Sequence, residues 1–116
     1  MRGLHWILVP SLAAILATAS SDLAAQEKVI RVTAEKFKFI PAVIDLKLGE
    51  PVVLELTTLD RKHGFQVPDL NIDETIEPGK PTLVRIVPAK AGTFHFHCSI
   101  FCGSGHEDMA GEIVVR

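Results

Sequence analysis

Soft metal-binding side chains recur at a regular spacing near the C-terminus of this chain. Two thiols, an imidazole and a thioether, contributed by Cys98, Cys102, His106 and Met109, follow one another at the spacing C-x-x-x-C-x-x-x-H-x-x-M. A second imidazole, His63, lies upstream. Copper is the metal that uses thiolate, imidazole and thioether ligands together. The set therefore predicts a copper site, and its two thiols favour a site with two metal ions.

Zinc and mononuclear copper are the competing interpretations of this ligand set. Cys/His sites usually hold zinc, but structural zinc motifs pair their cysteines with a second Cys or His pair at similar spacing. Met109, three residues after His106, favours copper instead. A mononuclear blue-copper site uses one Cys, two His and an axial Met, and its second His follows the Cys closely. Because Phe101 and Cys102 occupy those positions here, the spacing favours a dinuclear site.

The elements that must position these side chains are short β-strands. From Val29 onward, apolar and polar residues alternate at period two, and turns such as Pro78-Gly79 and Ala91-Gly92 separate the runs. Seven or eight such strands predict an all-β sandwich or barrel, and no stretch has a sustained helical period. The expected strands are 30–33, 37–39, 44–48, 52–57, 64–67, 82–87, 93–98 and 111–115.

The strand over residues 93–98 is expected to deliver the first thiol. Successive side chains of a strand point to opposite faces, so Phe94, Phe96 and Cys98 share one face. This aromatic face must point into the core, which places Cys98 at the inner end of a rigid strand. His95 and His97 then point to solvent.

The N-terminus has the pattern of an export signal. Arg2 precedes an apolar run over residues 4–19, and small residues permit cleavage after Ala19 or Ala25. We expect residues 1–26 to be a removed signal peptide, with an uncleaved N-terminal anchor over residues 4–19 as the alternative. The remaining residues 27–116 are enough for one domain, exported to a periplasmic or extracellular compartment.

Export makes a disulfide between Cys98 and Cys102 the structural alternative to a metal site. In an oxidising compartment a pair of cysteines is expected to be bonded. A disulfide does not, however, explain His63, His106 and Met109 in register with the thiols. An enzyme with a Cys/His nucleophile is a weaker interpretation, because no orienting third group is apparent. We expect no catalysis by the domain itself.

The charge balance argues against a nucleic-acid partner. The net charge is −2. Removal of the leader does not change it, because the leader contains one basic residue, Arg2, and one acidic residue, Asp22. Nucleic-acid binding needs a strongly basic stripe, which the sequence lacks. Four acidic residues between the predicted strands are expected to form a solvated loop, with a docking patch for a basic protein as the alternative. They are Asp69, Asp73, Glu74 and Glu77.

Taken as a whole, residues 29–116 resemble the CuA domain, the soluble copper domain of cytochrome c oxidase subunit II, and the related domain of nitrous-oxide reductase. The resemblance implies a cupredoxin-like Greek-key β-sandwich of seven to eight strands that holds two copper ions. The motifs that carry it are Asp60-x-x-His63-Gly64-Phe65, residues 98–109, Phe37-x-Phe39-x-Pro41, Pro78-Gly79 and Gly111-x-Ile113-Val114-Val115.

The resemblance also implies a role for each candidate ligand. Cys98 and Cys102 would bridge the two copper ions, and His63 and His106 would each bind one of them. Met109 would be a weak axial ligand, and the backbone carbonyl of Ile100 would be the weak ligand on the other side. Which copper ion takes the thioether cannot be read from the spacing.

The function implied is the transfer of single electrons between a cytochrome c-like donor and a terminal oxidase-type acceptor. A periplasmic copper-binding or copper-delivery module with the same ligands is the alternative. The membrane portion of an oxidase subunit is missing here, which favours a free-standing exported protein that contacts a membrane only if its leader is uncleaved. Trp6 is the one tryptophan, so the surface tryptophan of many relatives is absent from the domain. Phe37, Phe39 and the edge of His106 are the substitutes for electron uptake.

Overall fold

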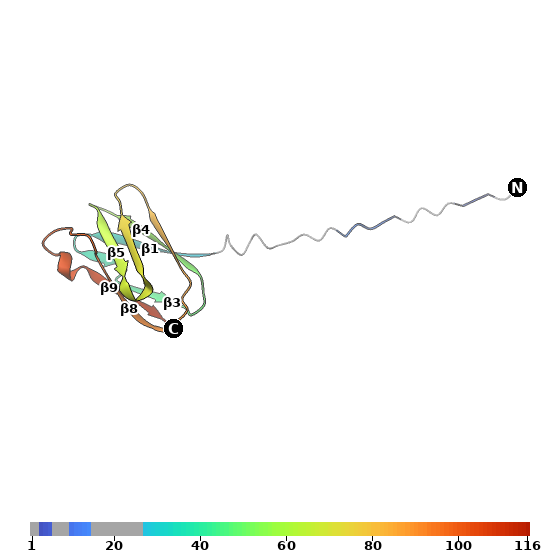
Figure 1. Cartoon of the computed structure of the whole chain (residues 1–116). Coiled ribbons are helices and arrows are strands. Elements are labelled where there is room, and N and C mark those ends of the chain that lie inside the picture. The colour runs from blue at the N-terminus through green and yellow to red at the C-terminus, as the bar shows by residue number, and fades with distance from the viewer. Residues whose placement is uncertain (1–2, 6–9, 15–26) are drawn as a thin grey trace.

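The computed structural model describes residues 3–5, 10–14 and 27–116, and residues 27–116 form a sandwich of two β-sheets (Figure 1). Most of the predicted leader, including Trp6 and both cleavage positions, lies outside the described residues. The leader and its boundary at residue 26 therefore stay predictions. Among the residues that are described, no helix is long and apolar enough to span a membrane.

The described residues form nine strands and two short 3-10 helices, which confirms the prediction of an all-β sandwich. One sheet has the order β2-β1-β4-β7 and the other the order β3-β9-β8-β5-β6. The pairs β1 with β4 and β3 with β9 are parallel, and the other pairs are antiparallel. The elements are β1 (Lys28–Glu35), β2 (Lys38–Ile40), β3 (Val43–Leu46), β4 (Val52–Thr58), β5 (His63–Val67), η1 (Pro68–Leu70), β6 (Ile72–Ile76), β7 (Thr82–Ile86), β8 (Gly92–His97), η2 (His106–Asp108) and β9 (Ala110–Val115).

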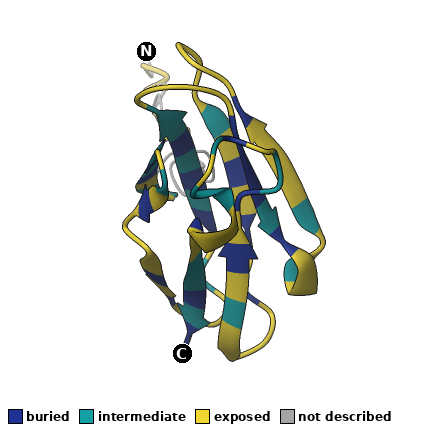
Figure 2. Cartoon of the chain, turned by 90° about the vertical axis from the view of Figure 1, so that its left-hand side faces the viewer, coloured by how far each residue is buried: buried dark blue, intermediate teal, exposed yellow. Residues whose placement is uncertain are grey.

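Alternate residues of the strands fill the space between the two sheets, as Figure 2 shows by the banding of buried and exposed positions. Val52, Leu54 and Leu56 of β4 are buried, and the residues between them, Val53 and Glu55, are half-buried. This period of two is the one that the sequence predicted for a strand packed on one face. Burial of apolar surface is the main stabilising term for such a sandwich.

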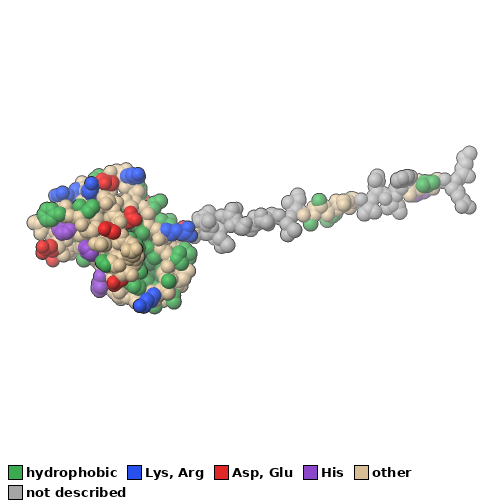
Figure 3. Space-filling model, in the orientation of Figure 1, with side chains coloured by type: hydrophobic (Ala, Val, Ile, Leu, Met, Phe, Trp, Pro, Cys, Tyr) green, Lys and Arg blue, Asp and Glu red, His purple; other side chains and the backbone are tan. Residues whose placement is uncertain are grey.

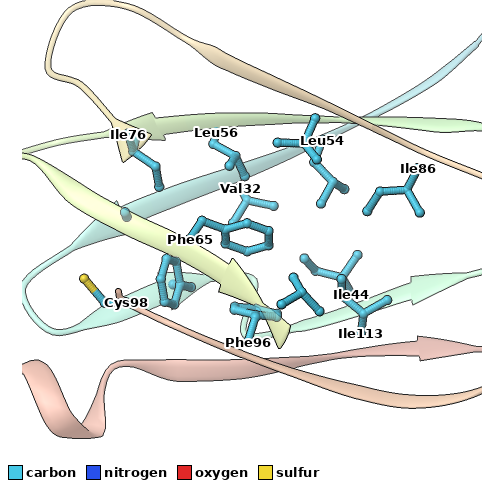
Figure 4. Packing of buried hydrophobic residues seen from close by; sticks show 14 of the residues in the cluster. Val32, Ile44, Leu54, Leu56, Phe65, Ile76, Ile86, Phe96, Cys98 and Ile113 are labelled. Carbon is cyan, nitrogen blue, oxygen red and sulfur yellow. The ribbon is translucent and has the colours of Figure 1, made fainter. Parts of the chain in front are cut away.

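Three phenylalanines pack together in the core beneath the candidate metal-binding loop. Phe65 and Phe96 have ring centroids 4.8 Å apart, and Phe39 meets them edge-on at 5.9 and 5.2 Å. Cys98 lies beside this cluster, at the end of the strand that carries Phe96 (Figure 4). Each fully buried phenylalanine contributes roughly 1.5–3 kcal/mol to stability. The first candidate thiol is therefore attached to the packed aromatic part of the core.

Two expectations about the strands were wrong. The acidic segment containing Asp73 and Glu74 is the edge strand β6, not a loop; its polar residues are exposed, and only its end residue Ile76 is fully buried. Because an edge strand has few core-facing positions, its composition resembles that of a loop. Strand β3 ends at Leu46, and Leu48 is half exposed beyond it.

Candidate metal centre

The candidate ligands meet at one end of the sandwich, at the left in Figure 1. The connection from β8 to β9, which contains η2, turns back at this end. His63 is the first residue of β5 and Cys98 directly follows β8. Cys102, His106 and Met109 all lie in the connection from β8 to β9. Strand β5 and the loop that leaves its neighbour in the sheet, β8, thus contribute the whole set.

The two thiols are at the centre of the group. Both are free, with their Sγ atoms 3.6 Å apart. Cys98 Sγ lies 3.9 Å from His63 Nδ1, and Cys102 Sγ lies 3.7 Å from His106 Nδ1. The structure therefore pairs each thiol with an imidazole of its own and does not join the two thiols in a disulfide.

Each of the two weak candidate donors lies next to a different thiol. Met109 Sδ is 3.7 Å from Cys102 Sγ, and the carbonyl oxygen of Ile100 is 3.0 Å from Cys98 Sγ. All six residues that the sequence singled out are consequently within one small volume. Within the part of the chain that the structure describes, the ligand atoms of His63, Cys98 and Cys102 are all within 4.8 Å of one another.

Burial divides the donors into an inner and an outer set. His63, Cys98, Cys102 and Met109 are almost fully buried, whereas His106 is half-buried. Water is excluded from the thiols, and a His106 ligand would face the surface. Phe101, whose side chain is 73% exposed, lies beside His106 with ring centroids 5.6 Å apart.

This distribution corrects the expectation for electron uptake at Phe39. That ring is a core residue with 2% exposure and cannot meet a partner. His106 remains accessible, and Phe37 is partly buried against the core. The exposed aromatic ring next to the site is Phe101, which the sequence did not single out for this role.

The β8–β9 loop has a fixed shape because its backbone is hydrogen-bonded within itself and packed on Phe37. The Cys98 N–H donates to the carbonyl of Met109 at 3.0 Å, which closes the base of the loop. A Cβ atom at Gly103 or Gly105 would collide with the ring of Phe37. Two glycines thus allow this ring to pack against the loop that carries Cys102, His106 and Met109.

Gly64 brings the loop against β5. Its N–H points to Cys98 Sγ at an N–S distance of 3.4 Å. A Cβ at this position would lie 2.8 Å from the backbone nitrogens of Ser99 and Ile100 and would also collide with Ser99 Oγ. Real Cβ atoms do not come so close, so glycine is required at position 64 for this seating of the loop.

Asp60 orients His63 from outside the candidate ligand set. Its Oδ1 atom lies 2.7 Å from His63 Nε2, and its other oxygen accepts the N–H of Lys36 at 2.7 Å. Burial acts to raise the pKa of Asp60, but the hydrogen bonds from His63, Lys36 and Arg61 outweigh it and lower the pKa to about 2. The carboxylate is ionised at neutral pH and can only accept, so His63 Nε2 carries the proton. In neutral His63, Nδ1 then has a free electron pair on the side of Cys98.

We expect Asp60→Ala to weaken copper uptake by about 10- to 100-fold, the usual effect of losing an outer partner of a ligating histidine. The ring of His63 would lose the acceptor that fixes its tautomer and orientation. Competition against a copper chelator would measure the change. Asp60→Asn, which keeps an acceptor oxygen and removes the charge, is the matched control. Equal affinity of Asp60→Ala and the unmodified protein would contradict this role.

Cys102 is protonated in the metal-free protein at neutral pH. Burial raises the pKa of its thiol to about 11, and the hydrogen bond and charge of Cys98 act in the same direction. Thiolates, not thiols, bind metals. A metal ion entering this site must therefore displace the proton, and binding weakens as the pH falls.

The chemistry of the donors fits copper. Two thiols, two imidazole nitrogens, a thioether and one carbonyl form a soft to borderline set, whereas magnesium and calcium need oxygen ligands. His95 and His97 are not part of it: both are exposed on β8, as predicted from the strand alternation. The sequence motif contained Asp60 and Gly64 but did not give either a role, because their contacts exist only across the fold.

Comparisons with known proteins agree with the architecture of this site. The family model described as a cupredoxin-like domain matches residues 8–115. Cytochrome c oxidase subunit 2 of Thermus thermophilus is 34% identical over 87 residues, which are 75% of this chain and 64% of the relative. Nitrous-oxide reductase of Cupriavidus necator is 31% identical over 91 residues, 75% of this chain but 14% of the enzyme. The chain thus spans less than two thirds of either relative.

Solved structures give the same picture. A chain of a heme-copper terminal oxidase dimer is similar, with a TM-score of 0.70, 28% identity and coverage of 79% of this chain and 67% of that chain. The periplasmic domain of subunit II of cytochrome oxidase from Bradyrhizobium japonicum has a TM-score of 0.71 at 18% identity, covering 77% of this chain and 83% of that domain. The second likeness is one of fold alone. The predicted resemblance to oxidase subunit II and nitrous-oxide reductase is confirmed.

Proposed function

Because the chain belongs to the family of cupredoxin-like domains, we propose that it is a copper protein that carries single electrons through a dinuclear centre. The observation that carries this proposal is the pair of free, buried thiols 3.6 Å apart, each with its own imidazole. A mononuclear site needs one thiol between two imidazoles. Here a second thiol occupies the middle of the site, which supports two ions bridged by sulfur.

In this proposal six residues hold the metal. Cys98 and Cys102 would both contact the two ions, and His63 and His106 would each hold one of them. Met109 and the Ile100 carbonyl would be the two weak ligands: Met109 Sδ lies 3.7 Å from Cys102 Sγ, and the Ile100 oxygen lies 3.0 Å from Cys98 Sγ. Because both sulfurs would contact both ions, these distances support the two as members of the site and assign neither to one ion.

The chain's own contribution is to keep these donors in place. Bound copper would accept and return one electron at a time. Electron transfer is fast when the ligands move little between the two redox states. Cys98 continues from a core strand, the loop base is closed by the Cys98–Met109 hydrogen bond, and Asp60 holds His63. The residues are therefore organised before an electron arrives.

The partners proposed are a cytochrome c-like donor and a terminal oxidase-type acceptor. This follows from the relatives, which are oxidase subunits, and from the half-buried His106 with the exposed Phe101 beside it. A similar domain is described as periplasmic, which supports an exported location together with the predicted leader. Burial of four of the six donor residues favours retention of copper, and thus electron transfer over copper delivery.

Electron spin resonance of the copper-loaded protein tests the proposal. We expect hyperfine coupling of one unpaired electron to two equivalent copper nuclei, and two copper ions per chain by elemental analysis. Coupling to a single nucleus would refute the dinuclear centre. Transfer of copper to a metal-free oxidase domain without rapid electron exchange with a cytochrome c would instead support the delivery role.

Met109→Leu is expected to keep two copper ions and raise the reduction potential. The two side chains have similar volumes, so the buried site should tolerate the change at a cost below about 1.5 kcal/mol. A thioether donates electrons more to the oxidised state, and its loss should shift the potential upward on the order of 60 mV, a tenfold change for one electron. Voltammetry of the loaded protein measures this. A variant that loses one copper ion would show that Met109 is a structural ligand and not a tuning one.

A further inference from the structure

Asp73 contacts the candidate ligand loop from a strand that provides no ligand. It lies on β6, the edge strand, and its Oδ1 atom accepts a hydrogen bond from Ser99 Oγ at 3.0 Å. Ser99 stands between Cys98 and Ile100, whose carbonyl lies 3.0 Å from the Cys98 sulfur. Asp73 thus holds the residue that links two of the candidate donors, the Cys98 thiol and the Ile100 carbonyl.

This contact crosses over a whole strand. Strand β5 lies between β8 and β6 in the sheet, and strands two positions apart are separated by roughly 9.5 Å. The loop spans this distance because it folds over β5 at Gly64, where the nitrogens of Ser99 and Ile100 come within 2.8 Å of the place a Cβ would occupy. A side chain at position 64 would lift Ser99 away from Asp73.

Asp73 has no competing ion pair in residues 27–116. The salt bridges found there join other residues, and its one described side-chain hydrogen bond is to Ser99. On its own strand it is paired through the backbone with Gln66 of β5. In this part of the structure, Ser99 of the loop is therefore the one side-chain partner described for the Asp73 carboxylate.

We propose that Asp73 is a positioning residue: its hydrogen bond to Ser99, reaching across Gly64, fixes the Cys98–Ile100 segment in the arrangement that holds copper. We call this hydrogen bond the Asp73–Ser99 clasp. The inference rests on the proposed function for its consequence, since the segment contributes one bridging thiol and one weak carbonyl ligand. The clasp itself is a hydrogen bond between two side chains of this chain and involves no metal.

The test uses the full-length protein with four variants and one control. Asp73→Ala and Ser99→Ala each remove the clasp, and the double variant removes both partners. Asp73→Asn keeps an acceptor oxygen for the Ser99 hydroxyl and loses the charge. Glu74→Ala, at the next position of the same exposed strand, removes the same charge without touching Ser99.

Two measurements are made on each protein. Amide hydrogen exchange of Gly64 and Cys98 in the metal-free chain, whose N–H groups donate to Cys98 Sγ and to the Met109 carbonyl, reports the clasp without copper. The rate of copper loss to a chelator reports its effect on the loaded site. We expect Asp73→Ala and Ser99→Ala each to raise both rates about fivefold, as for the loss of one typical hydrogen bond. The double variant should be no faster than either single one, because the partners act as a pair.

Asp73→Asn and Glu74→Ala should both stay near the rates of the unmodified protein. The clasp is overturned if Asp73→Ala leaves amide exchange unchanged, if the two single effects add in the double variant, or if Glu74→Ala matches Asp73→Ala. If the unmodified protein binds only one copper ion, the dinuclear proposal fails. The clasp is still tested in that case, because amide exchange is measured without copper. A dinuclear parent with unchanged copper loss in Asp73→Ala overturns the positioning role alone.

Discussion

Replacing Cys102 with serine is expected to abolish the two-copper signal while leaving the sandwich folded. Cys102 contacts three other candidate donors: its sulfur lies within 3.7 Å of the Cys98 sulfur, His106 Nδ1 and Met109 Sδ. A serine oxygen is a hard donor that does not replace a bridging thiolate for copper. Hyperfine coupling to two equivalent nuclei should disappear, and copper content should fall from two ions to one or none.

The fold should tolerate this change because Cys102, although buried, lies in the β8–β9 loop and outside the core strands. A buried hydroxyl in place of a thiol costs about 1–3 kcal/mol when it lacks a good partner, so thermal unfolding should shift but remain cooperative. Ser104→Ala is the matched control, since Ser104 is an exposed residue of the same loop. If Cys102→Ser retained two equivalent copper nuclei, the sulfur bridge would have to be abandoned.

The candidate ligands could be proposed from the sequence because most of them lie in one segment of twelve residues. Alternation along residues 93–98 correctly placed Phe96 and Cys98 inward and His95 and His97 outward. The spacing alone could not show that His63 meets Cys98, which lies 35 residues away. That contact was implied by the resemblance to a family, and the structure brings the two residues together.

The supporting residues could not be predicted, for a physical reason. Asp60, Gly64 and Asp73 act through contacts that depend on strand register and on how a loop crosses a sheet. Asp73 belongs to an edge strand whose polar residues resemble a loop, so neither its strand nor its partner was expected. Local patterns report periodicity and turns, whereas such contacts are set by tertiary packing.

Gly64→Ala is expected to lower copper affinity by at least tenfold and to destabilise the fold by about 1–3 kcal/mol, the usual cost of overpacking. The new methyl group would stand 2.8 Å from the Ser99 and Ile100 nitrogens and would collide with Ser99 Oγ. The loop must lift, which draws the Cys98 sulfur away from the Gly64 N–H that now lies 3.4 Å from it. Chelator competition and thermal unfolding measure the two effects separately.

A second variant distinguishes a seating defect from general damage to β5. In Gly64→Ala/Ser99→Ala the collision with the hydroxyl is gone, but the backbone nitrogens at 2.8 Å remain. Affinity should therefore recover only in part, because the backbone collision remains and because the Asp73–Ser99 clasp is also lost. Asp60→Ala, by contrast, should impair copper binding through His63 and leave the loop seated. Unchanged copper affinity in Gly64→Ala would mean that the loop does not need its seat on β5 to hold the metal.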